Sequence, residues 1–362
     1  MSSSRFVKIM FMWPLSRLYG LGVAMRNMFF DRGLLSQKTF DIPVIAVGNI
    51  AVGGTGKTPH TEYIVDNLKD EYRIGILSRG YRRRTRGFVL ATNESHPDDI
   101  GDEPYQLYRH FGGKIMVAVC EDRVKGIEQM QRIDPDLQMI VLDDAFQHRY
   151  VKPTVAIVLS EYNRLPFNDK LMPLGRLRET PRSLDRADAV VITKCPDSAQ
   201  PIDFRMIREH LNLFPYQKLI FSHYVYKGLR PVFPDAVESV PDFNSYGKSD
   251  VVVSLTGVAN PRPFLRYLRS TGSKVKVLRF DDHHRFTSSD MQLLKRKYQT
   301  VSQNPRAIII TTEKDAVRLA SCPYFPPELR DKIFYIPIAV EVLPHSDIEI
   351  PDLIRQTIRA NL

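Results

Sequence analysis

Residues 51–58 read AVGGTGKT, a glycine-rich stretch between two segments of different periodicity. The apolar run Pro43–Val47 precedes it and predicts a buried strand. The segment that follows places Ile64, Val65 and Leu68 on one helical face. A strand, a glycine-rich loop and a helix in this order are typical of a phosphate-binding loop, or P-loop. The sequence therefore predicts an α/β protein with a P-loop NTPase-like sheet.

Each residue type in this loop suits a bound nucleotide. The glycines allow successive backbone N–H groups to turn toward the phosphates, and the helix N-terminus adds a partial positive charge. Lys57 is expected to reach the β- and γ-phosphate oxygens, and the Thr58 hydroxyl is expected to bind Mg²⁺. Ala51 departs mildly from the glycine of the strict pattern. The predicted nucleotide-binding residues are Ala51, Val52, Gly53, Gly54, Thr55, Gly56, Lys57 and Thr58.

A second phosphate-site element is predicted where another apolar run ends in acids. Met139–Leu142 runs directly into Asp143 and Asp144. A strand that ends in a carboxylate is the arrangement that holds Mg²⁺ beside a P-loop. One of the two carboxylates would hold the ion directly or through water, and the other would orient it. The alternative is a helix N-cap that merely follows a strand.

Strand-like runs alternate with helical segments along the whole chain, which favours βαβ units and a largely parallel sheet. The runs are too numerous for one sheet, so we expect a second, smaller α/β domain. We predict an N-terminal segment over residues 1–36, a core domain over 37–220 and a C-terminal domain over 221–362, joined by an extended linker. The predicted strands are Val44–Val47, Ile74–Leu77, Ile115–Val119, Met139–Leu142, Val155–Leu159, Ala189–Thr193, Leu219–Phe221, Val251–Leu255, Ala307–Thr311 and Ile333–Ile338.

Charge and cysteine content narrow the possible partners. Lys and Arg number 51 against 41 Asp and Glu, a net charge of +10, so the protein should favour an anionic partner. Cys120, Cys195 and Cys322 are widely spaced and form no CxxC pair. This spacing predicts neither a zinc site nor a disulfide framework, and a reducing cytosol is the simplest compartment.

The N-terminal segment is apolar but too interrupted to span a membrane. Lys8, Pro14 and Arg17 break the run from Phe6 to Met25, whereas a spanning helix needs about 20 nearly uninterrupted apolar residues. Apolar residues beside several cations are typical of an amphipathic helix in the membrane interface. A helix packed on the protein's own core is the alternative.

Two other classes of P-loop protein fit the sequence less well. ATPases with a deviant loop carry a Lys directly before the paired glycines, where this chain has Val52. GTPases read guanine with an Asn/Thr-Lys-x-Asp element, and residues 193–197 (TKCPD) place the Asp one residue too far along. A GTPase or ATPase that acts as a switch or binding module, without a lipid acceptor, stays open as the alternative function. No stacking-aromatic motif indicates nucleic-acid binding.

The loop and its surroundings resemble one family, the tetraacyldisaccharide 4′-kinases of lipid A biosynthesis. The one departure noted is 173–179 (PLGRLRE), where that family more usually has a Pro-Ala-Gly-Pro-Leu-Arg-Glu run. The similar blocks, in order, are 47–59 (VGNIAVGGTGKTP), 77–81 (LSRGY), 101–104 (GDEP), 141–148 (VLDDAFQH), 177–179 (LRE), 193–194 (TK), 256–261 (TGVANP), 282–283 (DH) and 312–317 (TEKDAV).

The resemblance implies transfer of the ATP γ-phosphate to the 4′-hydroxyl of a tetraacylated glucosamine disaccharide 1-phosphate. It also implies a protein peripheral to the cytoplasmic face of the bacterial inner membrane, with no nucleic acid and no obligate protein partner. By the family pattern, Asp102 is the base, His283 pairs with it, Glu103 lies near the metal and Arg79 lies near the nucleotide. The implied catalytic residues are Asp102, His283 and Lys57, and the metal residues are Thr58, Glu103, Asp143 and Asp144.

Overall fold

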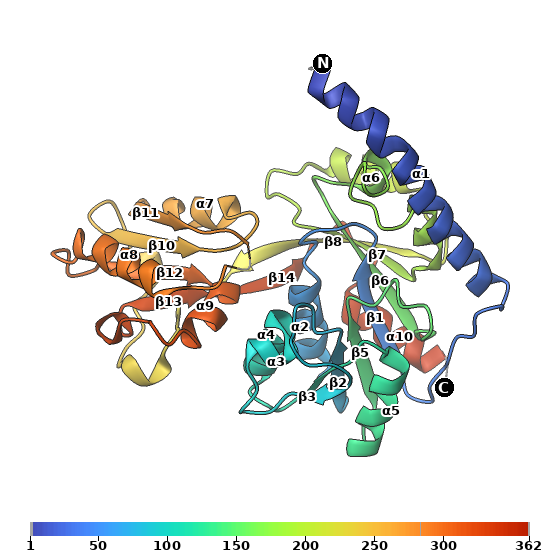
Figure 1. Ribbon diagram of the computed structural model, residues 1–362, viewed down its shortest axis with the longest axis horizontal. Coiled ribbons are helices and arrows are strands. Elements are labelled where there is room, and N and C mark those ends of the chain that lie inside the picture. Colours follow the sequence, from blue (N-terminus) through green and yellow to red (C-terminus); the bar gives the residue numbers. More distant parts are fainter. Residues whose placement is uncertain (1–2, 283, 361–362) are drawn as a thin grey trace.

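The computed structural model describes residues 3–282 and 284–360, and two β-sheets organise this part of the chain (Figure 1). The larger sheet contains β1 (Val44–Asn49), β2 (Ile74–Ser78), β3 (Val89–Leu90), β4 (Met116–Val119), β5 (Met139–Asp143), β6 (Val155–Glu161), β7 (Ala189–Thr193), β8 (Lys218–Tyr226) and β14 (Ile338–Val342). Their order is β14-β8-β7-β6-β1-β5-β2-β4-β3. All pairings from β8 to β4 are parallel, and only the two edge strands pair antiparallel.

Helices cover both faces of this sheet, as its apolar strands require. Helices α2, α4 and α10 share a buried cluster with one face, while α5 and α6 pack on the other. The helices of this unit are α2 (Lys57–Leu68), α3 (Pro97–Ile100), α4 (Asp102–Phe111), α5 (Arg123–Ile133), α6 (Pro201–Leu211) and α10 (Ile350–Ala360). Short 3₁₀ turns span Pro166–Asn168, Pro181–Arg186, Pro234–Ala236, Phe243–Ser245 and Pro327–Leu329 along the chain.

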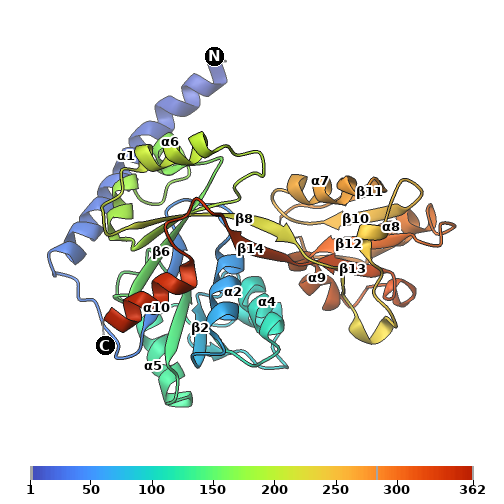
Figure 2. The same ribbon diagram turned by 180° about the vertical axis from the view of Figure 1, so that it is seen from behind.

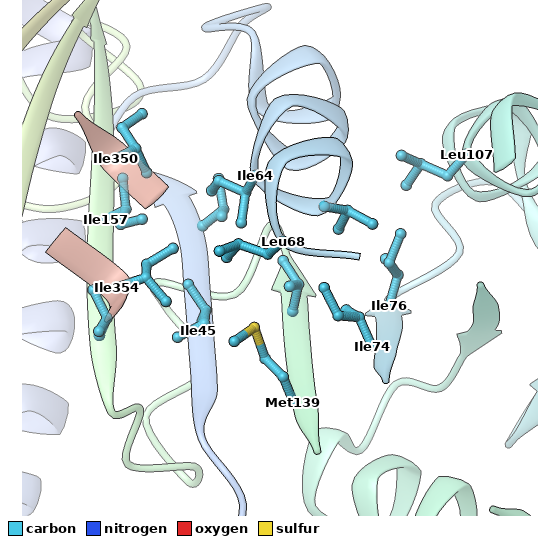
Figure 3. Close-up of a cluster of buried hydrophobic side chains, with 14 of the residues drawn as sticks. Ile45, Ile64, Leu68, Ile74, Ile76, Leu107, Met139, Ile157, Ile350 and Ile354 are labelled. Carbon is cyan, nitrogen blue, oxygen red and sulfur yellow. The ribbon is translucent and has the colours of Figure 1, made fainter. Parts of the chain in front are cut away.

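The helix that follows the P-loop is fixed by the core beneath it. Ile64 and Leu68 of α2 are fully buried and point toward the sheet, where Ile45 and Met139 meet them (Figure 3). Ile354 of α10 closes the same cluster from the end of the chain (Figure 3). The P-loop therefore lies between a buried strand and a helix that cannot shift without opening the core.

The second sheet is smaller and lies beside the first. Its order is β11-β10-β12-β13-β9, with β9 antiparallel and the other pairings parallel. Figure 2 shows it at the far end of β8 and β14 from α10. Its elements are β9 (Arg230–Pro231), β10 (Val251–Thr256), α7 (Arg262–Ser270), β11 (Lys274–Arg279), α8 (Ser288–Gln299), β12 (Ile308–Thr312), α9 (Glu313–Ala320) and β13 (Ile333–Ile336).

The chain returns to the larger sheet at its end. The predicted strand Ile333–Ile338 is instead two strands, β13 and β14, because Pro337 has no N–H to donate and interrupts the pairing. Strand β14 then pairs with β8, and α10 packs with α2. Residues 338–360 thus lie on the larger sheet, although the sequence grouped them with residues 221–362.

Helix α1 (Ser3–Asp31) lies along the outside of the larger unit (Figure 1). Its inner side is tied to the body by polar contacts: the Ser16 hydroxyl donates to the Leu171 carbonyl at 2.8 Å, and the Tyr19 hydroxyl donates to the Arg178 carbonyl at 3.0 Å. Its outer side exposes Met10, Phe11, Trp13, Leu15, Leu18, Leu21, Met25 and Phe29. Within the described residues, no helix combines the length and apolar content of a membrane span.

The predicted fold class is confirmed: a mostly parallel sheet flanked by helices, a smaller α/β unit and an N-terminal helix. Two short strands, β3 and β9, and the edge strand β11 were not predicted. In β11, Lys274 and Lys276 alternate with half-buried valines, which is the pattern of a half-exposed edge strand and differs from the continuous apolar runs of the predicted strands.

Candidate active site

The P-loop connects β1 to α2 at the carboxyl edge of the larger sheet. The Asn49 side chain donates to the Thr55 hydroxyl at 2.8 Å, and the Thr193 hydroxyl donates to the Thr55 carbonyl at 2.8 Å. These two bonds hold the loop to the ends of β1 and β7. The Lys194 ammonium also donates to the Gly54 carbonyl. The predicted phosphate-binding residues thus form one loop, and neighbouring strands fix its shape.

Gly56 is the loop position that no other residue could occupy. Its φ of 93° lies in the left-handed region, and a Cβ placed there would meet the Tyr224 hydroxyl at 1.7 Å. That hydroxyl is buried and has no hydrogen-bond partner in the described part of the chain. His60 lies one turn further along, where its Nδ1–H donates to the Gly56 carbonyl at 2.7 Å and its Nε2 accepts from Ser222 at 2.9 Å. The loop is therefore packed directly against β8.

The two aspartates at the end of β5 face the P-loop lysine and a second cation. Lys57 Nζ lies 3.7 Å from Asp144 Oδ1, and Arg178 lies 3.3 Å from the same oxygen. Asp143 is fully buried and accepts from the Thr61 hydroxyl at 3.4 Å. Burial, and then the charge of Glu103, raise the pKa of Asp143 to about 7. Four predicted site residues therefore interact electrostatically at this edge of the sheet: Lys57, Glu103, Asp143 and Asp144.

These residues fit a magnesium ion held together with nucleotide phosphates. Oδ2 of Asp143 is buried without a hydrogen-bond partner in the described residues, so it is free to bind a cation. Thr58 is buried at the first turn of α2, where the P-loop pattern expects its hydroxyl to meet the ion. No three Asp, Glu, His or Cys side chains of the described chain cluster closely enough to enclose a metal alone. Mg²⁺ commonly keeps waters and shares substrate phosphates, so a sparse protein shell suits it.

The first turn of α4 carries the two carboxylates of the GDEP segment, and both face the smaller unit. Asp102 Oδ2 accepts from Arg318 of α9 at 2.5 and 3.1 Å. Lys314 Nζ lies 3.7 Å from Glu103 Oε1. The predicted contact of Asp102 with His283 cannot be described, because His283 lies outside the described residues. The neighbouring His284 contacts Asp290 at 2.9 Å, at the N-terminus of α8.

Arg79 follows β2 directly and is exposed at the same edge of the sheet as the P-loop. Its charge lowers the pKa of the nearby His148, after the larger effects of burial and of Arg123. The Arg79 side chain therefore lies near His148, in the segment that follows β5.

Several residues of this edge were not assigned by sequence reasoning. Arg178 contacts both Asp144 and Gln147, and Lys194 bridges the P-loop to Glu161 at 3.1 Å. Arg318 reaches Asp102 from α9 of the smaller unit. Arg178 and Lys194 fall within the blocks that carry the family resemblance, which is a signal that could have identified them. Arg318 lies just past the TEKDAV block, and only the tertiary structure brings it to Asp102.

Known proteins match both the sequence and the structure of the whole chain. The sequence profile of the tetraacyldisaccharide-1-P 4′-kinase family matches residues 9–358. The tetraacyldisaccharide 4′-kinase of Bacteroides thetaiotaomicron is 45% identical over 350 residues, which cover 94% of this chain and 91% of that protein. That of Flavobacterium johnsoniae is 38% identical and covers 97% and 98%.

The crystal structure of LpxK from Aquifex aeolicus in complex with ATP is similar at a TM-score of 0.72. The Aquifex protein is 28% identical in sequence to this chain, and the match covers 95% of this chain and 98% of the Aquifex chain. The range matched by the family profile, residues 9–358, spans the P-loop, the β5 aspartates and the GDEP segment. The chain therefore belongs to the tetraacyldisaccharide-1-P 4′-kinase family.

Proposed function

We propose that this kinase transfers the γ-phosphate of ATP to the 4′-hydroxyl of a tetraacylated glucosamine disaccharide 1-phosphate at the edge of the larger sheet. The observation that carries the proposal is the meeting of Lys57, Asp143 and Asp144 beside a P-loop, in a chain of this family. The alternative, a GTPase or ATPase switch without an acceptor, is disfavoured because the family match extends over both units.

The reaction asks the protein for positioning and charge neutralisation. Mg²⁺, when bound with ATP, neutralises phosphate charge that builds up during transfer. Lys57 stabilises the β- and γ-phosphate oxygens, and the P-loop amides hold the chain of phosphates in line. Arg178 is close enough to Asp144 to share in orienting the transferred group. Asp102 takes the proton of the sugar hydroxyl as its oxygen bonds to the γ-phosphorus and the bond to the leaving ADP oxygen breaks.

In this scheme Asp102 is oriented by residues of the smaller unit. Arg318 supplies one such partner, and the family pattern supplies His283 as another. A protonated imidazole beside a carboxylate favours its ionised form, so the two groups would titrate as a unit. Substitution of His283 by Ala should therefore move the low-pH limb of kcat while ATP binding stays intact. An unchanged profile would exclude the dyad but leave the kinase assignment intact.

The same proposal includes binding to the cytoplasmic face of the inner membrane through α1. From Met10 to Asp31, where the side chains of this helix are described, eight large apolar residues are exposed, and Arg17 and Arg26 lie among them. Exposed apolar patches of this kind mark interaction sites, and cations beside them favour anionic headgroups. The lipid acceptor would then be taken from the membrane surface without leaving it.

We also propose that the chain has a core domain over 37–220 and a smaller domain that begins near residue 221, joined by β8. The separate sheets and separate buried clusters support this division. Because β14 and α10 pack on the larger sheet, residues 338–360 are assigned to the core domain rather than to the smaller one.

The decisive experiment is a transfer assay with the purified full-length protein. Labelled ATP, Mg²⁺ and the tetraacyldisaccharide 1-phosphate in detergent micelles should yield labelled lipid. Omission of the acceptor should leave only slow hydrolysis of ATP. Equal nucleotide turnover with and without the acceptor, and no label in the lipid, would instead support the switch or binding module.

A further inference from the structure

One face of the smaller unit is strongly cationic. Residues 251–280 contain six Lys and Arg and no Asp or Glu, so this segment contributes +6 to the net charge of +10. Three of the six are arginines of α7: Arg262, Arg266 and Arg269. Their spacing of four and then three residues places them on one side of the helix, and all three are exposed. We call this row of residues the arginine stripe.

Strand β11 extends the cationic face along the edge of the smaller sheet. Lys274 and Arg279 are exposed at its two ends, and the half-buried Lys276 donates to the Thr300 hydroxyl at 2.9 Å. Lysines on an edge strand prevent its pairing with another chain, so these lysines have a structural explanation. The arginine stripe lies on a helix, and that explanation does not apply to it.

The arginine stripe does not stabilise the helix that carries it. Arg262 is the first residue of α7, where the partial positive charge of the helix N-terminus disfavours a cation. Arg266 is four residues after Arg262 and three before Arg269, and like charges at these spacings repel. None of the three forms an ion pair with a carboxylate in the described part of the chain. A row of cations that disfavours its own helix and has no internal partner indicates an external, anionic one.

We propose that the arginine stripe is a second membrane-contact surface, which binds the anionic headgroups of a lipid bilayer. This inference rests on the membrane-binding part of the proposed function and deepens it: α1 supplies an apolar contact, and the stripe supplies an electrostatic one. Cations near an anionic bilayer are attracted to it, and the attraction falls off within a Debye length. The stripe therefore acts only on a bilayer that carries negative charge.

The position of α7 suits contact with the same membrane as α1. Figures 1 and 2 show α7 along one edge of the smaller unit, and the N-terminal part of α1 lies at the same edge of the larger unit, at the top of both views. Met10, Phe11 and Trp13 are exposed on that part of α1. One membrane surface can therefore meet apolar side chains of the larger unit and cations of the smaller unit.

The aromatic residues of α7 argue against nucleic acid as the partner. Proteins that bind single strands present aromatic rings on which the bases stack. Phe264 is buried, and the ring of Tyr267 is stacked on Tyr226 with the ring centroids 4.1 Å apart. Both rings of the helix are thus packed within the smaller unit. The stripe offers charge without stacking, which suits the phosphates of lipid headgroups.

The test is co-sedimentation of the full-length protein with two kinds of vesicle, one of phosphatidylcholine and one of an equal mixture of phosphatidylcholine and phosphatidylglycerol. Three triple variants are compared with wild type. The Gln variant replaces all three arginines of the stripe by Gln, and the Lys variant replaces them by Lys. The α8 variant combines Lys295→Gln, Arg296→Gln and Lys297→Gln, which removes the same charge from a helix on the opposite face of the smaller sheet.

The Gln variant should bind the mixed vesicles about 10- to 100-fold more weakly than wild type and the phosphatidylcholine vesicles equally well. The Lys and α8 variants should bind the mixed vesicles nearly as wild type does, because the bilayer attracts charge near its surface and does not require guanidinium geometry. Added salt should reduce the difference between wild type and the Gln variant. The unfolding temperature of the Gln variant should not be lower than that of wild type, since repulsion within α7 is removed.

Three results would overturn the inference and leave the other proposals intact. The first is equal binding of wild type and the Gln variant to the mixed vesicles, and the second is an equal loss in the α8 variant, which would show that net charge alone matters. The third is an equal loss in the Lys variant, which would indicate a partner that requires the paired hydrogen bonds of arginine.

A duplex oligonucleotide tests the rival partner. If wild type retains it and the Gln variant does not, while both bind the mixed vesicles equally, the stripe binds nucleic acid and the inference is wrong. If wild type binds neither kind of vesicle, the membrane-binding part of the proposed function fails together with the stripe. Transfer of phosphate to the lipid in detergent micelles tests the kinase function separately from both.

Discussion

Two adjacent aspartates at the end of β5 occupy different environments and suit different tasks. Asp143 is buried in the regular strand, and this burial, followed by the charge of Glu103, raises its pKa. Asp144 has φ 51°, a left-handed conformation that Asp tolerates better than most residues. This conformation lets its side chain meet Lys57 and Arg178. We therefore expect Asp143 to bind the metal cation and Asp144 to position the side chains of Lys57 and Arg178.

Replacing Lys57 by Ala should abolish measurable transfer and keep the fold. The γ-phosphate loses its fixed counter-ion, and loss of one such electrostatic contact costs about 10²–10³-fold or more in kcat. Transfer of labelled phosphate to the lipid measures the effect, and thermal unfolding verifies the fold. Lys69→Ala at the end of α2 is the control, because Lys69 contacts Asp66 at 2.5 Å and the ring of Phe111, and neither belongs to the P-loop. Near wild-type turnover of Lys57→Ala would exclude the P-loop as the active centre.

His60 should make the stability of the protein depend on pH below neutrality. Burial lowers the pKa of His60 to about 4 from its ordinary value of 6.5, and its bonds to Gly56 and Ser222 fit the neutral ring. Between these pH values the unfolded chain binds the extra proton, so the stabilisation is complete above about 6.5 and is lost as pH falls toward 4. The loss is at most on the order of 3 kcal/mol.

Thermal unfolding of wild type and His60→Gln between pH 4.5 and 7.5 measures this contribution. Other groups titrate in both proteins, so the difference between the two curves isolates His60. The unfolding temperature of wild type should fall more steeply on acidification. Parallel curves would show that His60 is not held neutral.

Helix α1 combines two unlike surfaces at the scale of a single element. Its inner side contacts the body through Ser16, Tyr19 and Asn27, the last of which donates to Glu179 at 2.9 Å. Its outer side is apolar and exposed. Because the inner contacts are polar and specific, the helix is positioned by the fold, and its apolar side is left for another partner. Core packing, one interpretation of the N-terminal segment, thus describes the inner side of the helix, and contact of the outer side with a membrane interface stays a prediction.

Replacing Leu18 by Glu should weaken binding to vesicles that contain anionic lipid about tenfold or more, since one buried leucine contributes about 1.5–3 kcal/mol. Leu18 is 66% exposed, so the fold should be unaffected. Leu34→Glu is the matched control, because Leu34 is 68% exposed but lies outside α1. Co-sedimentation with vesicles measures binding, and added salt should weaken it in all three proteins. Equal binding of Leu18→Glu and Leu34→Glu would contradict a membrane role for this side of α1.

At the scale of the whole molecule, the two units meet through ion pairs next to the P-loop edge. Arg285 pairs with Asp98 at 2.7 Å, but both side chains are largely exposed, and such pairs contribute little. The Arg318–Asp102 pair is more buried, with exposed fractions of 9% and 24%. The proposed base therefore depends on the smaller unit for its closest described partner. Correct contact between the units should matter to catalysis more than to ATP binding.

A double-mutant cycle of Asp102→Asn and Arg318→Gln tests this dependence. Asp102→Asn should lower kcat about 10²–10⁴-fold, the range for a positioned base. Arg318→Gln should cost less, and the double variant should be hardly worse than Asp102→Asn, because residues that act as a unit are non-additive. ATP affinity should stay constant, and Arg296→Gln, an exposed arginine of α8, is the control. Multiplying losses would show that the two residues act independently.

The sequence by itself determined the P-loop, the acids after β5 and the alternation of strands and helices. Each of these is a local pattern: a glycine needed at φ 93°, a continuous buried run, or a carboxylate at a strand end. Such patterns can be recognised in the sequence because local backbone geometry and burial restrict which residue types can follow one another. The carboxyl edge of a parallel sheet then brings the loop and the acids together.

Only the tertiary structure decided which distant residues complete the site. Arg318 and Asp102 are 216 positions apart in the sequence. The chain leaves the smaller sheet at Pro337, after β13, and then forms β14, which pairs with β8. The sequence pattern of β14 would suit either sheet, because β-branched runs record burial and not the identity of the partner strand. The tertiary structure also decided which side of α1 faces the body, because that side forms hydrogen bonds with Leu171 and Arg178, 155 and 159 positions away in the sequence. Long-range pairing depends on packing of the whole chain, and no local pattern specifies it.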